Sequence, residues 1–144
     1  MGFDLNGVGE HLKRPNINWD NDKQVQEYFK WEKETPGAYF RNNSWWWRPL
    51  WQYVCLIADD ILSDEQKKAG HYNDGMLIDE GTTKKIGERL DIALSSGDVK
   101  IYESARNSFM KYFKDKAFTS YYFNEDNVRK FKDFCLNSGG FTID

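Results

Sequence analysis

The sequence is poor in the residues that build covalent or metal-held frameworks. It contains two cysteines, two histidines and three prolines among 144 residues. Cys55 and Cys135 lie far apart, and neither has a second cysteine or a nearby histidine at metal-ligand spacing. This excludes a disulfide framework and a compact cysteine-based metal motif. Both cysteines fall on the apolar faces of expected helices, so we predict structural thiols, and we expect no metal site and no cofactor.

Long hydrophobic runs are also missing. No stretch approaches the roughly 18 apolar residues needed to span a membrane, and the first residues lack the basic and apolar segments of a secretion signal. We therefore expect a cytoplasmic protein with no membrane partner. The 20 basic and 23 acidic residues give a net charge of −3. That balance argues against a protein that wraps duplex nucleic acid.

The chain lacks the short motifs that carry well-understood chemistry. It has no glycine-rich phosphate loop, no GxSxG nucleophile turn, no HExxH and no CxxC. The acidic residues are scattered, as on a solvated surface. We predict no catalytic residue from the sequence. Whether the protein is an enzyme stays open at this stage, and a non-enzymatic role is favoured.

Aromatic residues, by contrast, are abundant at 17% of the chain. Four of the six tryptophans fall between Arg41 and Leu62. The apolar positions after Pro49 recur at the spacing of an amphipathic helix: Leu50, Val54, Ile57, Ala58, Ile61 and Leu62. Proline lacks an N–H and fits only the first helical turn. We therefore predict that this helix begins near Arg48 or Pro49, after a turn or short 3₁₀ segment at 45–47.

Two interpretations of the tryptophans remain open. The rings can supply the hydrophobic mass of a small core, each burying ~150–250 Å². Alternatively, one or two of them form a stacking wall with Arg41 or Arg48 for a planar or anionic ligand, or anchor a partner protein. Adjacent indoles diverge on any regular backbone, so we expect at least one at the surface. The candidate ligand- or partner-binding residues come from this stretch and from the turn-rich loop at 70–75: Arg41, Asn42, Asn43, Trp45, Trp46, Trp47, Arg48, Trp51, His71, Tyr72, Asn73 and Asp74.

The remaining pattern predicts a mainly α fold with about five to six helices and short peripheral β-strands at the termini, in a single compact domain over residues 1–144. An α+β arrangement is the alternative. Further helices are expected over Asp20–Glu34, after the capping box that opens at Ser63, over Asp79–Ser96, from Asp98 onward, and over Glu125–Asn137. Short strands are expected at Met1–Val8 and Phe141–Asp144, and Phe118–Phe123 is expected to be a strand or an extended linker. The last strand should pair with one of the other two.

The helix from Asp98 combines an apolar side with a basic surface. Its apolar side should face the core: Ile101, Tyr102, Ala105, Phe109, Tyr112 and Phe113. Between Lys100 and Lys116 there are five basic and two acidic side chains. A charged helix face is usually only solvated, so anion binding on this helix is a minor hypothesis.

Five segments together resemble a family of small bacteriophage-encoded proteins without an established activity. They are Met1–Gly7, Tyr39–Asn43, Trp45–Trp51, Gly70–Gly75 and Asn137–Phe141. The most specific of them is the Trp-Trp-Trp-Arg-Pro-Leu-Trp string, and the resemblance covers most of the chain. Members of that family also carry a zinc-ribbon-like cysteine cluster between the last two helices. Here the corresponding residues, 114–123, contain no cysteine, so a structural zinc is not carried over.

The resemblance implies a phage context, and the step from there to function is an analogy. Small non-structural phage proteins often act against host immunity. With the aromatic and arginine cluster, this favours anti-defence through binding of a small nucleotide-like ligand, as in second-messenger sequestration in the host cytoplasm. The first alternative is a protein–protein inhibitor of a CRISPR or other bacterial defence effector. The second is a homo-oligomeric structural or assembly protein.

Overall fold

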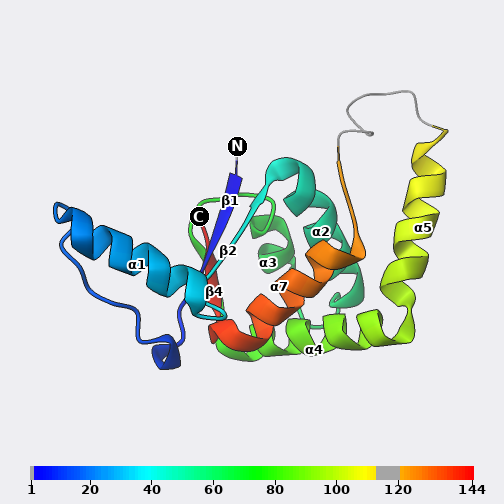
Figure 1. Ribbon diagram of the computed structural model, residues 1–144. Coiled ribbons are helices and arrows are strands. Elements are labelled where there is room, and N and C mark those ends of the chain that lie inside the picture. Colours follow the sequence, from blue (N-terminus) through cyan, green and yellow to red (C-terminus); the bar gives the residue numbers. More distant parts are fainter. Residues whose placement is uncertain (1, 113–120) are drawn as a thin grey trace.

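The computed structural model describes residues 2–112 and 121–144 (Figure 1). The elements are β1 Gly2–Gly7, the 3₁₀ turn η1 Glu10–Leu12, α1 Asp22–Glu34, β2 Tyr39–Asn43, α2 Ser44–Ile57, α3 Asp64–Ala69, β3 Met76–Ile78, α4 Glu80–Ser96, α5 Asp98–Met110, α7 Glu125–Ser138 and β4 Phe141–Ile143. The predicted class, mainly α with short strands near both ends of the sequence in one compact domain, is confirmed. Across the described ranges, no helix is both long and apolar enough to cross a membrane.

Most of the predicted helices start and stop at the residues that cap them. Asn21, Ser63, Asp79 and Asn124 each accept a hydrogen bond from a backbone N–H in the first turn of their helix. Gly97 ends α4 with a φ of +88°. A side-chain oxygen at the start of a helix satisfies a donor that has no partner within the helix. Local sequence therefore sets these boundaries.

The four strands form one antiparallel sheet in the order β2-β1-β4-β3. The strands nearest the two ends of the sequence are its two central strands, with Leu5 of β1 opposite both Phe40 and Ile143. Of the two partners considered for the last strand, the structure selects the N-terminal one. β3 was not predicted, and among the described strands it pairs only with β4. Three residues between two turns carry too little pattern to identify a strand.

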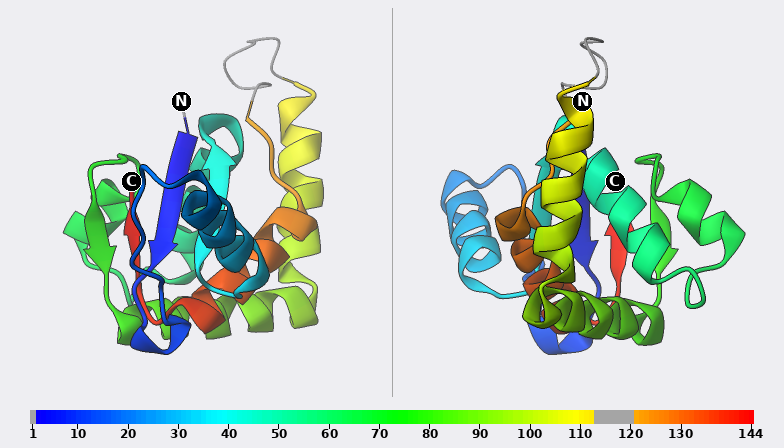
Figure 2. Two further views of the ribbon diagram at one scale, coloured as in Figure 1. Left: turned by 60° about the vertical axis from the view of Figure 1, so that its left-hand side comes forward. Right: turned by 90° about the vertical axis from the view of Figure 1, so that its right-hand side faces the viewer.

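One hydrophobic cluster joins the sheet to α2, α4 and α7 (Figure 2). Phe3 and Leu5 of β1 are fully buried and alternate with half-buried positions, as expected for a strand with one face on the core. Trp47 lies at the centre of the cluster, with its ring 5.8 Å from Phe3 and 5.5 Å from Phe131. The interpretation of the tryptophans as core residues is therefore correct for part of the group.

α2 begins at Ser44, so the prediction of a start near Pro49 was wrong. Asn43 accepts a hydrogen bond from the Trp46 N–H at 3.2 Å and caps the helix. Pro49 lies in the second turn, where it cannot donate to the carbonyl oxygen of Trp45. The N–H of Tyr122 donates to that oxygen instead, at 2.9 Å. Because a distant residue supplies the missing bond, the helix continues through the proline.

α5 rises from the end of α4 and meets the core through few side chains (Figure 1). Val99 is buried, and Tyr102 packs on Tyr53 and Phe123 with ring centroids 4.6 and 4.8 Å apart. The side that the sequence predicted to face inward is largely exposed, with Ile101 67% accessible. The apolar spacing marked a stripe correctly, but the stripe lies mostly at the surface. Phe113 and residues 118–120 fall outside the described residues, and residues 121–123 belong to no helix or strand.

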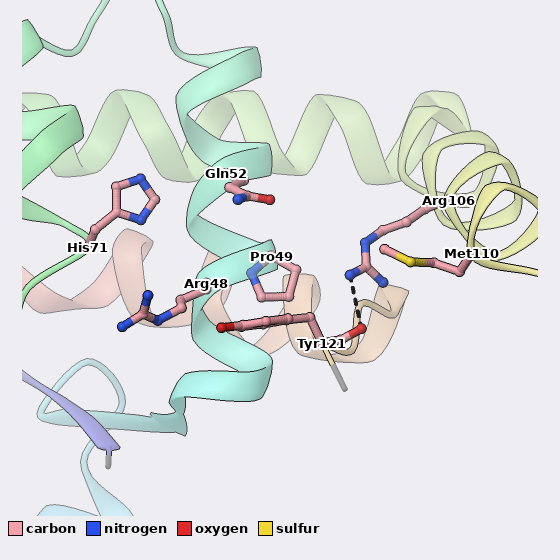
Figure 3. A pocket seen from close by; sticks show the side chains of 7 residues that line it. All are labelled: Arg48, Pro49, Gln52, His71, Arg106, Met110 and Tyr121. Carbon is pink, nitrogen blue, oxygen red and sulfur yellow. Dashed lines mark hydrogen bonds between the residues drawn. The ribbon is translucent and has the colours of Figure 1, made fainter. Parts of the chain in front are cut away.

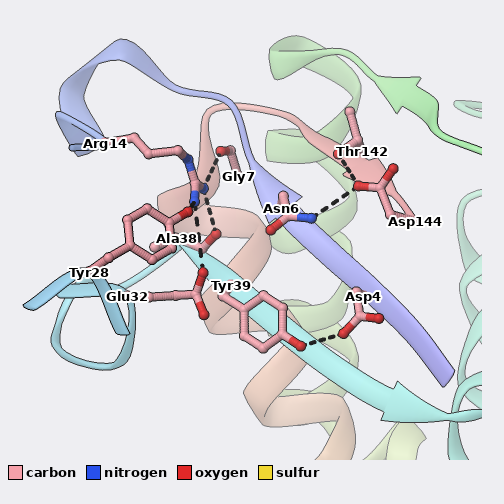
Figure 4. A network of polar contacts seen from close by, with 10 residues as sticks. All are labelled: Asp4, Asn6, Gly7, Arg14, Tyr28, Glu32, Ala38, Tyr39, Thr142 and Asp144. Atoms are coloured by element: carbon pink, nitrogen blue, oxygen red, sulfur yellow. Dashed lines mark hydrogen bonds and ion pairs between the residues drawn. The ribbon is translucent and has the colours of Figure 1, made fainter. Parts of the chain in front are cut away.

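On the opposite flank, Arg14 joins α1 to the sheet (Figure 4). Its guanidinium donates to the carbonyl oxygens of Gly7 and Ala38, both at 2.9 Å, and to the Tyr28 hydroxyl at 2.5 Å. It also lies 5.1 Å from the centre of the Trp31 ring. A guanidinium carries five donors in a fixed fork. One side chain therefore ties the loop before α1, the sheet and α1 together.

The two cysteines are free thiols on helices, as predicted. Cys135 is buried in α7, and Cys55 is half-buried in α2. Burial raises the pKa of the Cys55 thiol to about 11. A thiol with a raised pKa holds little thiolate at neutral pH, so neither cysteine is placed for nucleophilic chemistry.

Candidate functional site

A cavity of about 340 Å³ lies between α2, α5 and the segment that precedes α7 (Figure 3). We call it the arginine cavity. Seven residues line it: Arg48, Pro49, Gln52, His71, Arg106, Met110 and Tyr121. Small-molecule sites commonly measure ~300–1,000 Å³. The volume is therefore suited to one small ligand or to one unit of a larger one.

The tyrosine wall of the cavity is positioned from both sides. The Tyr122 N–H bonds to Trp45 in α2, as described above, which brings Tyr121 against that helix. The Tyr121 ring meets the Trp45 ring edge-on at 5.2 Å. From α5, Arg106 Nη2 donates to the Tyr121 carbonyl oxygen at 2.9 Å. Pro49, which frees the Trp45 carbonyl, thus helps to build the site as well as lining it.

The buried tryptophans hold the backbone next to the cavity in place. Trp47 and Trp51 are fully buried and their rings stack at 5.5 Å. Their Nε1 atoms donate to the carbonyl oxygens of Gly70, at 2.7 Å, and Lys67, at 2.9 Å. These bonds fix the end of α3, immediately before His71. The two rings were predicted to be ligand-binding candidates, but they are enclosed in the core and act on the cavity through the backbone.

The lining of the arginine cavity is cationic. It includes Arg48, Arg106 and His71, and among the described residues that line it there is no aspartate or glutamate. Within the described part of the chain, Arg48 Nε is buried and has no hydrogen-bond partner. A buried donor without a partner costs about 1–3 kcal/mol, and more when it is charged. Such a donor calls for a partner, and none of the described residues supplies one.

The titration behaviour of the lining agrees with this arrangement. Burial, together with the neighbouring positive charge of Arg48, lowers the pKa of His71. Burial also lowers the pKa of Arg106, and Tyr102 offsets this only in part. Both shifts mean that positive charge is unfavourable here without a counter-ion. An anion bound in the cavity would relieve this cost.

A pH titration of stability tests the surroundings of His71. Its pKa lies below the usual 6.5 in the folded protein. As the pH falls through that value the unfolded chain binds the proton first, and the free energy of unfolding decreases. Between about pH 7.5 and about pH 5.5, urea denaturation should therefore show a larger loss of stability for the wild type than for His71→Asn. Parallel losses in the two proteins would contradict the repulsion described here.

The adjacent indoles diverge as expected. Trp45 is 45% exposed, Trp46 is half-buried and Trp47 is fully buried. The first two stand beside the cavity, because Trp45 touches Tyr121 and Trp46 packs on Tyr122 with ring centroids 5.2 Å apart. The prediction that at least one of the three rings reaches the surface is confirmed.

Arg41 and Asn42 lie elsewhere, in a depression of about 690 Å³ between α1 and α7. Arg41 forms an ion pair with Asp4 at 2.7 Å, and Asn42 exchanges two amide hydrogen bonds with Asn127 at 2.9 and 3.1 Å. The lining mixes acidic and basic side chains, among them Glu32, Lys33, Lys130 and Asp133. Although this depression is larger, its predicted binding groups already have partners, so it is the weaker candidate for an anion.

The remaining candidates serve the fold or line a separate surface. Asn43 caps α2, and Asn73 donates to the Gly2 carbonyl oxygen at 3.1 Å. Tyr72 and Asp74 line a shallow depression beside α3. Of the twelve predicted residues, only one arginine and the histidine line the arginine cavity.

Sequence reasoning missed Gln52, Arg106, Met110 and Tyr121. Arg106 was assigned to a solvated basic face. A signal was present, because Arg106 stands four residues after Tyr102 and four before Met110, on the stripe that turns toward α2. Tyr121 belongs to Phe118–Phe123, which was predicted to be a strand or an extended linker, and neither prediction placed its ring beside α2.

No protein-family model, curated protein or solved structure matches the chain. In the residues that the structure describes, no group of three or more histidine, cysteine, aspartate or glutamate side chains is placed to hold a metal ion. The residues that line the cavity are therefore the basis for inferring what the protein binds. Its guanidinium groups, imidazole, amide and phenol ring are suited to an anionic ligand with a planar part.

Proposed function

We propose that the protein captures a small nucleotide-like ligand in the arginine cavity. In a phage context it would act in the host cytoplasm, countering immunity by sequestering a nucleotide second messenger. The observation that carries the proposal is the buried Nε of Arg48, which has no partner among the described residues and belongs to a lining whose described residues include no carboxylate. The resemblance to phage proteins suggests the biological setting, and the cavity suggests the ligand chemistry.

Each wall of the cavity suits one part of a nucleotide. Arg48 and Arg106 offer donors to phosphate oxygens, which guanidinium groups bind in a bidentate manner. The ring of Tyr121 lies beneath Pro49 in the view of Figure 3, with its hydroxyl toward Arg48, and offers a base a face to stack on. Gln52 can both donate to and accept from a base edge. Phosphate and base would thus be recognised together.

The lining favours binding over turnover. The described residues that line it include no carboxylate, cysteine, serine or threonine. Among these residues, none supplies His71 with an acidic side chain to orient its ring, as a general base usually requires. A protein that holds a signalling nucleotide without converting it would remove that signal in proportion to its own concentration.

A thermal-shift panel tests the proposal. It should contain mononucleotides, cyclic di- and oligonucleotides, ADP-ribose derivatives and inorganic phosphate. A ligand at 100 times its Kd should stabilise the protein by ~2.7 kcal/mol. Arg48→Gln should weaken binding of the responding ligand by about 10- to 100-fold, because a hydrogen bond to a charged group contributes about 1.5–3 kcal/mol.

Arg41→Gln is the matched control, since Arg41 lies in the other depression and pairs with Asp4. It should leave the affinity within about twofold of the wild type. Denaturation curves of both variants would establish that they are folded. The absence of a shift with every member of the panel, or equal losses of affinity in the two variants, would refute the proposal.

A second candidate is inhibition of a host defence protein, such as a CRISPR effector, through protein–protein contact. Exposed aromatic side chains favour it, namely Trp19, Phe29 and Trp45, because tryptophan often anchors protein interfaces. A pull-down from host lysate distinguishes the two. A stoichiometric partner that survives nuclease treatment, and is lost with Trp19→Ala but not with Arg48→Gln, would support this candidate. Light scattering would address the homo-oligomeric alternative.

A further inference from the structure

A second cavity of about 220 Å³ lies beside the arginine cavity. Arg106, Met110 and Tyr121 line both. Beyond them, the second cavity is walled by Trp46, Asn107 and Tyr122, among others. Because three residues belong to both linings, the two cavities are direct neighbours.

The second cavity offers aromatic surface. The rings of Trp46 and Tyr122 lie 5.2 Å apart at 32°. Tyr122 is 49% exposed, so part of its ring is open to a ligand. Stacking of a base on such a ring tolerates any base, since every base has a π-face. The position of the Tyr122 backbone is fixed by its bond to Trp45, so the ring is held in place before a ligand arrives.

The polar groups of the second cavity suit the same ligand class. As in the first cavity, the lining residues that the structure describes include no aspartate or glutamate. The Asn107 amide forms no side-chain hydrogen bond to any other described residue, so its donor and acceptor are open to a base edge. Arg106 lines both cavities, and its Nη2 donates to the Tyr121 carbonyl oxygen. The other N–H groups of its guanidinium can donate to a phosphate that lies between the cavities.

We propose that the ligand is a dinucleotide, an inference that rests on the function proposed above. One base would stack on Tyr121 in the arginine cavity, and the other on the Trp46–Tyr122 pair. A phosphate joining the two nucleosides would lie against Arg106. The arrangement selects two planar groups separated by one anionic link, a feature that linear and cyclic dinucleotides share.

Isothermal titration with a mononucleotide and a dinucleotide of each common base tests this. The dinucleotide that binds best should bind the wild type at least tenfold more tightly than its mononucleotide. Tyr122→Ala should weaken dinucleotide binding at least fivefold and leave mononucleotide binding within about twofold. The backbone N–H that bonds to Trp45 is retained in this variant. Asn107→Ala, at an exposed position, gives a second variant with the same expected pattern.

The outcomes separate the two proposals. Equal affinities for the mononucleotide and the dinucleotide, or equal losses of both in Tyr122→Ala, would overturn the dinucleotide and leave nucleotide capture standing. No binding of either ligand would overturn both. A single-stranded hexanucleotide adds a third arm. If it binds tighter than the dinucleotide, the ligand is a nucleic-acid strand and the inference is wrong.

Discussion

Replacing Trp47 with alanine is expected to lower the free energy of unfolding by about 3–5 kcal/mol. The side chain is fully buried and stacks on Phe3 and Trp51, with Phe131 edge-on to it. Removing it opens a cavity at the junction of the sheet, α2 and α7. It also deprives the Gly70 carbonyl oxygen of its donor. Urea denaturation followed by circular dichroism would measure the loss.

Trp45→Ala is the matched control, since it removes the same ring two residues earlier. Trp45 is 45% exposed, so the expected loss is about 1 kcal/mol or less, as for most surface changes. The two variants differ only in which indole is removed. If both variants lost a similar free energy of unfolding, the buried and exposed rings would contribute equally to stability, and this would contradict the packing described here.

Gly37→Ala is expected to destabilise the protein by about 3–5 kcal/mol, through backbone strain and crowding together. Gly37 has a φ of +83°, and a Cβ there would lie 2.3 Å from the carbonyl carbon of Asn137 and 2.6 Å from the nitrogen of Ser138. These are backbone atoms at the end of α7, which a rotamer change cannot move. On the neighbouring strand, a Cβ on Gly7 would lie 1.9 Å from the Gly37 carbonyl oxygen.

Gly97→Ala separates the two contributions. Gly97 has a similar φ of +88°, but no atom lies within 4 Å of the position of its Cβ. It should therefore show only the backbone term, about 1–2 kcal/mol. The difference between the two variants, measured by urea denaturation, is the cost of separating the turn before β2 from the end of α7. If both variants lose the same free energy of unfolding, the close approach of Gly37 to the end of α7 does not contribute to stability.

The parts of the fold that depend on neighbouring residues were predictable from the sequence. The caps at Asn21, Ser63, Asp79 and Asn124 act on the first turn that follows them. The start of α2 was not predictable in the same way. Pro49 predicted a later start, and the Tyr122 N–H that bonds to the freed Trp45 carbonyl oxygen is contributed from a distant part of the chain.

The candidate site shows the same limit. Arg48 and His71 were selected because they stand in dense, unusual stretches of sequence. Arg106 occurs in a helix whose charges read as ordinary surface, and it becomes a binding candidate only when α5 is placed opposite α2. The residue types suggested the kind of ligand that a site could bind. The tertiary fold decides which individual residues come together to form that site. For the same reason Arg41, equally prominent in sequence, lies in a different depression.

The central place of β4 bears on how fast the chain can fold. Asp4 and Asp144 exchange backbone hydrogen bonds of 2.8 and 2.7 Å, so two of the innermost ladder contacts join nearly opposite ends of the described sequence. Closing such a long loop loses more entropy than forming local helical contacts, and folding slows as the average separation of contacting residues grows. Until β4 inserts, β3 lacks its neighbour and the buried edge of β1 is open. Exposed strand edges of this kind are where partly folded chains associate.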